Sequence, residues 1–145
     1  MTSGTLDVGP ALDRLIHAQD ADDDAVTFGR LREYSGRLAE LCQRLEDPLV
    51  WPVGSSAERL TGAAVILSGG KMRTRGWTTP LANERVLLVT VAAVTPLGLL
   101  EAAERAKALG ATEIFACGVR VEGLPADGIP QIKQFISLSA LGQRS

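Results

Sequence analysis

Apolar and polar residues follow one another along the chain in patterns that predict alternating helices and strands. Between residues 28 and 45 the apolar positions recur every three or four residues, with arginine and glutamate between them, which predicts an amphipathic helix. Asp47 and Pro48 end this pattern. The apolar residues 49–53 then predict a short strand, and Pro52 within it indicates a sheet edge or the end of a strand.

The second half of the chain predicts a strand, a helix and two more strands. Residues 86–89 are continuously apolar, as expected for a central parallel strand that is covered on both faces. Thr95 and Pro96 have the residue types of an N-cap and a first helical position, and the helix is expected to end at Leu109. Two further strands are expected over residues 113–119 and 134–138. This alternation predicts a doubly wound α/β fold, with a mainly parallel sheet flanked by helices.

A glycine-containing turn joins the strand predicted at residues 49–53 to the next predicted helix. Ser55 and Glu58 have the S-x-x-E spacing of a capping box. Gly54, Ser55 and Ser56 therefore follow a strand and open a helix, where free backbone N–H groups and the helix dipole favour anions. The same residues also serve simply to cap a helix, so both interpretations stay open.

Composition restricts the class of protein. The chain has 145 residues, 46% of them hydrophobic, and a net charge of −2, so we expect a single core and no basic nucleic-acid binder. No apolar run approaches the roughly 18 residues of a membrane helix, and no secretory signal is visible. We therefore expect a cytoplasmic protein without a membrane partner. Cys42 and Cys117 lie in apolar segments and are expected to be buried, reduced thiols.

Charge is distributed unevenly along the chain. Residues 1–26 carry six aspartates against one arginine, a net charge of −5, and we assign them as an acidic N-terminal segment before one α/β domain over residues 27–145. Residues 59–85 carry five cations against one acid, a net charge of +4. This central segment is either an anion-binding region or a solvated, arginine-rich loop. Its cations of interest are Lys71, Arg73 and Arg75.

One stretch resembles a known family. Residues 86–119, VLLVTVAAVTPLGLLEAAERAKALGATEIFACGV, resemble the signature region of type I phosphoribosyltransferases, in which a buried strand, a phosphate loop and an alanine-rich helix follow one another. Residues 54–56 stand where that family has its pyrophosphate loop, and residues 71–76 resemble the basic flexible loop of orotate-type members. Residues 135–138 look like the family's late strand, so the resemblance extends over residues 28–140.

The resemblance implies a function and a set of contacts. It implies a protein that binds a phosphorylated sugar or nucleotide, with Mg²⁺ as the family's cofactor, and that forms a homodimer or pairs with a related chain. No residue of this chain is assigned as a metal ligand or a catalytic group. The implied contacts are Gly54, Ser55 and Ser56 to pyrophosphate-like oxygens, Thr95 and Gly98 to a terminal phosphate, and Lys71, Arg73 and Arg75 as mobile countercharges.

The chain departs from the family at the loop that holds the ribose. Thr90 and Val91 stand where the family has paired acids, which hold the ribose hydroxyls and stabilise the positive charge that develops on the sugar. Thr90 offers one hydrogen bond but no charge, and losing preorganised stabilisation of this kind costs on the order of 10²-fold in rate. Val94, Thr95 and Pro96 replace the T-T-G loop, and Pro96 removes a backbone N–H. We therefore expect weak or no transferase activity.

Three alternatives remain open from the sequence. In the first, the protein is an active phosphoribosyltransferase that makes a nucleotide from phosphoribosyl pyrophosphate and a base, with Glu84 or Glu101 replacing the lost acids in part. In the second, it is a non-catalytic structural or regulatory subunit. In the third, it has no binding site, and residues 92–94 are packed into the core. Since His17 is the only histidine, neither a Ser–His triad nor a multi-histidine metal site is predicted.

Overall fold

A five-stranded parallel sheet forms the centre of the protein. The computed structural model describes residues 29–74, 80–93 and 95–141. The strands follow the order β2-β1-β3-β5-β7, and every neighbouring pair is parallel. They are β1 (Leu49–Pro52), β2 (Arg73–Thr74), β3 (Arg85–Val89), β5 (Glu113–Gly118) and β7 (Gln134–Ser137). A separate parallel ribbon consists of β4 (Ala92–Ala93) and β6 (Arg120–Val121).

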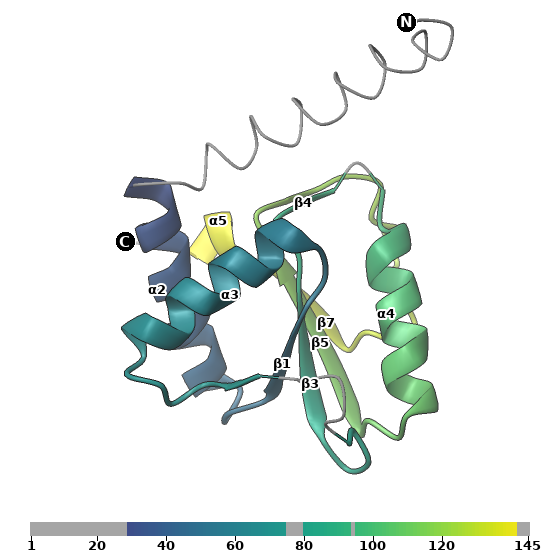
Figure 1. Ribbon diagram of the computed structural model, residues 1–145. Helices are drawn as coiled ribbons and strands as arrows, with labels where there is room; N and C mark the ends of the chain where they lie inside the picture. Colours follow the sequence, from purple (N-terminus) through teal and green to yellow (C-terminus); the bar gives the residue numbers. More distant parts are fainter. Residues whose placement is uncertain (1–28, 75–79, 94, 142–145) are drawn as a thin grey trace, which may run out of the picture.

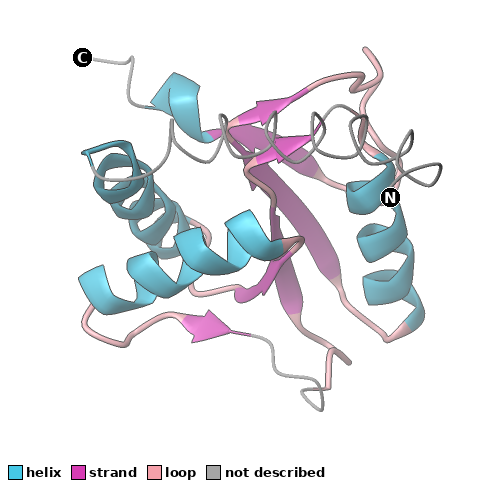
Figure 2. Cartoon of the chain, turned by 45° about the horizontal axis from the view of Figure 1, so that its top comes forward, coloured by secondary structure: helices cyan, strands magenta, loops and turns pink. Residues whose placement is uncertain are grey.

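Helices cover both faces of the sheet. The helices are α2 (Gly29–Arg44), α3 (Ser55–Leu67), α4 (Leu97–Ala108) and the short α5 (Leu138–Leu141). Helices α2 and α3 lie on one face and α4 lies on the other (Figures 1 and 2). Because all the strands run in the same direction, the sheet has an amino edge, where they begin, and a carboxyl edge, where they end. The predicted doubly wound α/β fold is thus confirmed.

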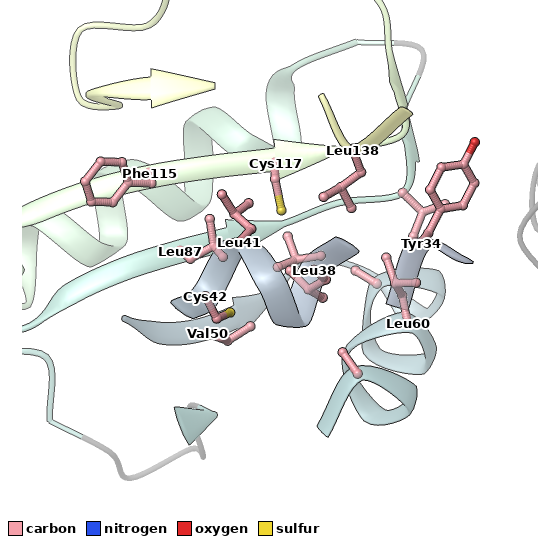
Figure 3. Packing of buried hydrophobic residues seen from close by; sticks show 14 residues of the cluster. Tyr34, Leu38, Leu41, Cys42, Val50, Leu60, Leu87, Phe115, Cys117 and Leu138 are labelled. Carbon is pink, nitrogen blue, oxygen red and sulfur yellow. The ribbon is translucent and has the colours of Figure 1, made fainter. Parts of the chain in front are cut away.

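Alternate side chains of the strands fill two separate cores. Leu87 and Cys117 pack with Leu38 and Leu41 of α2 on one face (Figure 3). The neighbouring residues on the same strands, Leu88 among them, pack against α4 on the other face. Both faces of β3 and β5 are therefore apolar, which explains why residues 86–89 show no polar alternation.

The structure corrects the predicted start of one helix. Helix α3 begins at Ser55 itself, so its N-cap is Gly54, and no side chain caps the helix. The predicted capping box of Ser55 and Glu58 is therefore wrong. Gly54 has φ 99° and ψ 163°, a conformation that side chains with a Cβ rarely adopt, so the backbone of the glycine determines where the helix starts.

Smaller differences occur at other element ends. Helix α4 begins at Leu97, so Pro96 rather than Thr95 is its N-cap. Leu67 and Leu109, which the helical periodicity directs inward, are 50% and 48% exposed, because they lie at or beyond the last turns of α3 and α4. Pro52 is the last residue of β1, beyond the two positions paired with β2, as predicted for a strand end.

Two further predictions concern the acidic N-terminal segment and membrane-spanning helices. The acidic segment over residues 1–26 lies outside the described residues. In the part of the chain that the structure describes, none of the helices has the length and apolar character needed to cross a bilayer.

Candidate functional site

A cavity of about 260 Å³ lies at the carboxyl edge, where β1 and β3 end. Two short segments line it, one following each strand, and the strands hold them together because the Val53 N–H donates to the Val89 carbonyl at 2.7 Å. Both segments leave the sheet at the end where β4 lies (Figure 1). The lining residues are Val53, Gly54, Ser55, Ser56, Thr90, Val91 and Ala92. The structure thus brings the predicted Gly54, Ser55 and Ser56 together with Thr90.

Gly54 directs the chain from β1 into α3 beside this cavity. Its carbonyl accepts the first hydrogen bond of the helix, from the Glu58 N–H at 3.0 Å. The backbone N–H groups of a helix's first turn point out of its end, and the helix dipole places partial positive charge there. Since Ser55 and Ser56 belong to that first turn and line the cavity, this wall of the cavity suits an anion.

Thr90 provides a polar group on the opposite segment. The residue is only 6% exposed, and its backbone N–H donates to the Cys117 carbonyl at 3.0 Å. Its Cγ2 methyl faces Gly118, since a Cβ built on Gly118 would lie 3.0 Å from both that methyl and the Thr90 carbonyl oxygen. No hydrogen bond to the Thr90 hydroxyl is formed within the described residues. The hydroxyl is therefore available to a molecule in the cavity.

The residues after Thr90 divide between core and cavity wall. Val91 is 3% exposed and belongs to the core beneath α2 and α3, and its carbonyl accepts hydrogen bonds from the N–H groups of Val119 and Arg120. Ala92 and Ala93 are half-buried in β4. Val91 is therefore packed into the core, whereas Ala92 and Ala93, for which core packing was one alternative, are only half-buried. Val94 lies outside the described residues.

The start of α4 is next to the cavity but does not line it. Thr95 is exposed, and its hydroxyl accepts a long hydrogen bond of 3.4 Å from the Leu97 N–H. A Cβ built on Gly98 would lie 3.5 Å from a methyl of Val53, which is a lining residue. Thr95 and Gly98 thus lie at the same edge of the sheet as the cavity.

The described residues of the basic segment do not line the cavity. Arg73 pairs in register with Leu49, the first residue of β1, whereas Gly54 comes five residues later, about 16 Å along an extended chain. At the amino edge Arg73 Nη2 donates to Glu84 Oε2 at 2.7 Å, and Nη1 donates to the Asp47 carbonyl at 3.2 Å. Lys71 precedes β2, and Arg75 lies outside the described residues. The structure therefore does not bring Lys71 and Arg73 to the cavity.

The acids considered as replacements are also elsewhere. Glu84 precedes β3 and is held by Arg73 at the amino edge, while Glu101 is exposed on α4. All the described residues that line the cavity are neutral. Within the described ranges, moreover, no group of three or more His, Cys, Asp or Glu residues has a metal-binding arrangement.

The two cysteines are core residues, as predicted. Both are free thiols, and both belong to the cluster shown in Figure 3. Burial, with a smaller contribution from Asp47, raises the pKa of Cys42 to about 12, and burial raises the pKa of Cys117 further. Because a thiolate is the reactive form, this burial disfavours a nucleophilic role for either cysteine.

Sequence reasoning missed part of the cavity. It did not find that Val53 and Ala92 line the cavity, nor that β4 and β6 pair beside it, with Ala92 opposite Arg120. Strands of two residues have no period that could be recognised in a sequence. The signal available was positional, since Val53 is the last residue of a predicted strand.

Comparisons with known proteins agree with this architecture. No protein-family model and no curated protein matches the chain. Among solved structures, it is similar to a purine phosphoribosyltransferase from Pyrococcus horikoshii Ot3, with 16% identity, a TM-score of 0.54, and coverage of 72% of this chain and 80% of that one. It is also similar to a hypoxanthine-guanine-xanthine phosphoribosyltransferase, with 11% identity, a TM-score of 0.50 and coverage of 74% and 76%. The chain therefore has the type I phosphoribosyltransferase fold.

Proposed function

We propose that the cavity binds the phosphate or pyrophosphate group of a phosphorylated sugar or nucleotide, and that the protein has weak or no transferase activity. The observation that carries this proposal is that Gly54 and the first turn of α3 line the same cavity as Thr90, whose hydroxyl has no hydrogen-bond partner among the described residues. Oriented N–H groups and a helix dipole bind phosphate oxygens, and a nearby hydroxyl suits a sugar.

The size of the cavity supports a small ligand. At about 260 Å³ it is below the 300–1,000 Å³ that is typical of drug-sized ligands. A phosphate with part of a pentose fits such a volume, whereas a nucleoside would extend outside it. Thr95 and Gly98, at the start of α4, would then contact a second phosphate outside the enclosed part.

The same lining argues against efficient transfer. Cleaving a glycosidic bond to the sugar develops positive charge on the ring, and a fixed carboxylate stabilises that charge. Thr90 is neutral, and Val91 is buried in the core. Glu84 is engaged at the opposite edge of the sheet, which disfavours an active enzyme that uses it as the replacement acid. Assembly as a homodimer or with a related chain, and a cytoplasmic location, stay predictions.

A binding experiment with a matched pair of variants tests the proposal. A ligand at 100 times its Kd stabilises the folded state by about 2.7 kcal/mol, so phosphoribosyl pyrophosphate, pyrophosphate and ribose 5-phosphate are each expected to raise Tm. Ser55→Asp places a carboxylate at the cavity wall, where it repels a phosphate but is compatible with a helix start. Ser55→Asn is its neutral counterpart.

We expect Ser55→Asp to unfold at the same temperature as the parent or higher and to lose the ligand-induced rise in Tm. Ser55→Asn is expected to keep most of that rise. No rise with any of the three ligands, or an equal rise in the aspartate variant, would overturn the assignment of the cavity.

An activity assay tests the second half of the proposal. Purified protein is incubated with phosphoribosyl pyrophosphate and a base (orotate, hypoxanthine or guanine), and nucleotide formation is followed by chromatography. Turnover at the rate of an ordinary enzyme, about 1 s⁻¹ or faster, would show that the neutral residues at positions 90 and 91 do not prevent transfer.

A further inference from the structure

The oxygen-bearing side chains that line the cavity in the described part of the chain are all neutral. Its polar side chains are the hydroxyls of Ser55, Ser56 and Thr90, and the other lining residues are glycine or apolar. Mg²⁺ in proteins that bind phosphates is held by one or two carboxylates together with the phosphates of the substrate. The residues present therefore do not fit an Mg²⁺ ion held by the protein, although Mg²⁺ is the cofactor that the resemblance implies.

The core packing also prevents position 91 from supplying a carboxylate. The Val91 side chain is packed with the apolar residues beneath α2 and α3, and it is 3% exposed. A carboxylate at position 91 would lose its contact with water and gain no polar partner in exchange, which is strongly unfavourable. Both positions line the cavity, but position 90 differs because Thr90 carries a hydroxyl, which has no partner in the described residues.

The absence of carboxylates from the lining changes what a phosphate ligand needs. Where acids line a phosphate site, a divalent cation has to offset their repulsion of the ligand. The first turn of α3, which lines this cavity, carries a partial positive charge equivalent to about half an elementary charge. An anion entering the cavity is attracted without a cation to bridge it to the protein.

We propose that this cavity binds its phosphate-bearing ligand independently of any divalent cation, through the first turn of α3 and the Thr90 hydroxyl. The inference rests on the proposed function and specifies it further. The ligand is a sugar phosphate or diphosphate in its metal-free, anionic form. The Ser55, Ser56 and Thr90 hydroxyls replace a metal and its carboxylates as the groups that orient it.

Calorimetric titration with ribose 5-phosphate tests the inference, since a single phosphate associates only weakly with Mg²⁺. The full chain is titrated once with EDTA and once with Mg²⁺. The two Kd values are expected to agree within about threefold, or roughly 0.7 kcal/mol. Binding that appears only with Mg²⁺, or is more than about tenfold tighter with it, would overturn the inference and leave the proposed function standing. Absence of binding under both conditions would overturn the proposed function itself.

A pair of variants at position 90 tests the electrostatic reason. Thr90→Asp places a carboxylate beside the bound phosphate, so metal-free affinity is expected to fall by about tenfold or more and to recover with Mg²⁺. Thr90→Asn has a similar size without the charge, and its affinity is expected to stay independent of Mg²⁺. An aspartate variant that folds and binds equally well under both conditions would contradict the inference. If it does not fold, the measurement on the parent chain still decides.

Discussion

The two edges of the sheet differ in the kinds of residue that they carry and in the contacts between those residues. At the amino edge, ion pairs join side chains that lie at or just before the first residues of different strands. Where β1 and β3 end, the carboxyl edge instead has a glycine turn and a cavity whose described lining residues are neutral. The ion pairs of the amino edge are Arg73–Glu84 at 2.7 Å, Arg85–Glu46 at 3.6 Å and Lys133–Glu113 at 2.5 Å.

Among the described residues, the basic side chains that the sequence offered as phosphate contacts lie away from the candidate site. The guanidinium of Arg73 is occupied by an acid and a carbonyl, and Arg85 likewise donates to the Glu46 carbonyl at 2.9 Å. Ligands of open parallel sheets bind outside the carboxyl ends of the strands, where the loops diverge. Under the proposed function, the neutral cavity between the ends of β1 and β3 holds the ligand, and the ion pairs of the amino edge contribute to the stability of the fold.

The largest effect is expected from crowding the carboxyl edge. Gly118→Ala would place a methyl 3.0 Å from the Thr90 carbonyl oxygen and from a methyl of Val121. Overpacking of this kind costs about 1–3 kcal/mol of unfolding free energy, and the shift of Thr90 should also weaken ligand binding. Urea unfolding and the ligand-induced rise in Tm measure the two effects.

Gly62→Ala is the control for that substitution. Gly62 is exposed within α3, and nothing lies within 4 Å of a Cβ built on it. Alanine there is expected to stabilise the protein by about 0.5–1 kcal/mol. A Gly118→Ala variant as stable as the parent, with unchanged binding, would show that the carboxyl edge is not tightly packed around Thr90.

A smaller effect is expected from removing an ion pair at the amino edge. Arg73→Gln should lower the free energy of unfolding by no more than about 1 kcal/mol, because the pair with Glu84 is partly exposed. The affinity for ribose 5-phosphate should not change, since Arg73 is at the edge opposite the cavity. Titration of the variant measures this. A tenfold loss of affinity would instead show that Arg73 reaches the ligand, as the resemblance to a basic flexible loop implies.

The smallest effect is a pH dependence confined to the amino edge. The hydrogen bond that Lys133 donates is the main cause that holds the pKa of Glu113 below its ordinary value of 4.5. A lowered pKa in the folded state contributes stability that is present above the unfolded value and lost as the pH falls through the folded value. Parent and Glu113→Gln should therefore differ in urea midpoint at pH 7 and converge well below pH 4.5. A difference that persists in acid would assign the effect to something other than this ionisation.

The elements with long, regular patterns could be predicted from the sequence. Helix α2 and strands β3 and β5 were found within one or two residues of their ends, because burial on one or both faces imposes a pattern that many residues share. The start of α3 was misplaced by one residue, since a capping pattern and a glycine turn compete there and only the backbone of Gly54 decides. Two-residue strands such as β4 have no pattern to detect.

Some of the candidate site residues could likewise be predicted from the sequence and others could not. Gly54, Ser55 and Ser56 were identified by their place after a strand, and the structure puts them with Thr90 around one cavity. Lys71 and Arg73 were chosen for their charge, and charge alone does not say which edge of a sheet a residue occupies. The register of β2 with β1, which places Arg73 beside Leu49, is what shows that Arg73 lies at the amino edge.

By itself the sequence determined the fold class, because the order of apolar runs and amphipathic stretches allows few arrangements that bury both. It also determined the neutrality of the loop after β3, since Thr90 and Val91 are neutral wherever they lie. Only the tertiary structure decided which residues meet. Cavities and ion pairs depend on contacts between segments that are distant along the chain, and the pairing of parallel strands brings those segments to a common edge.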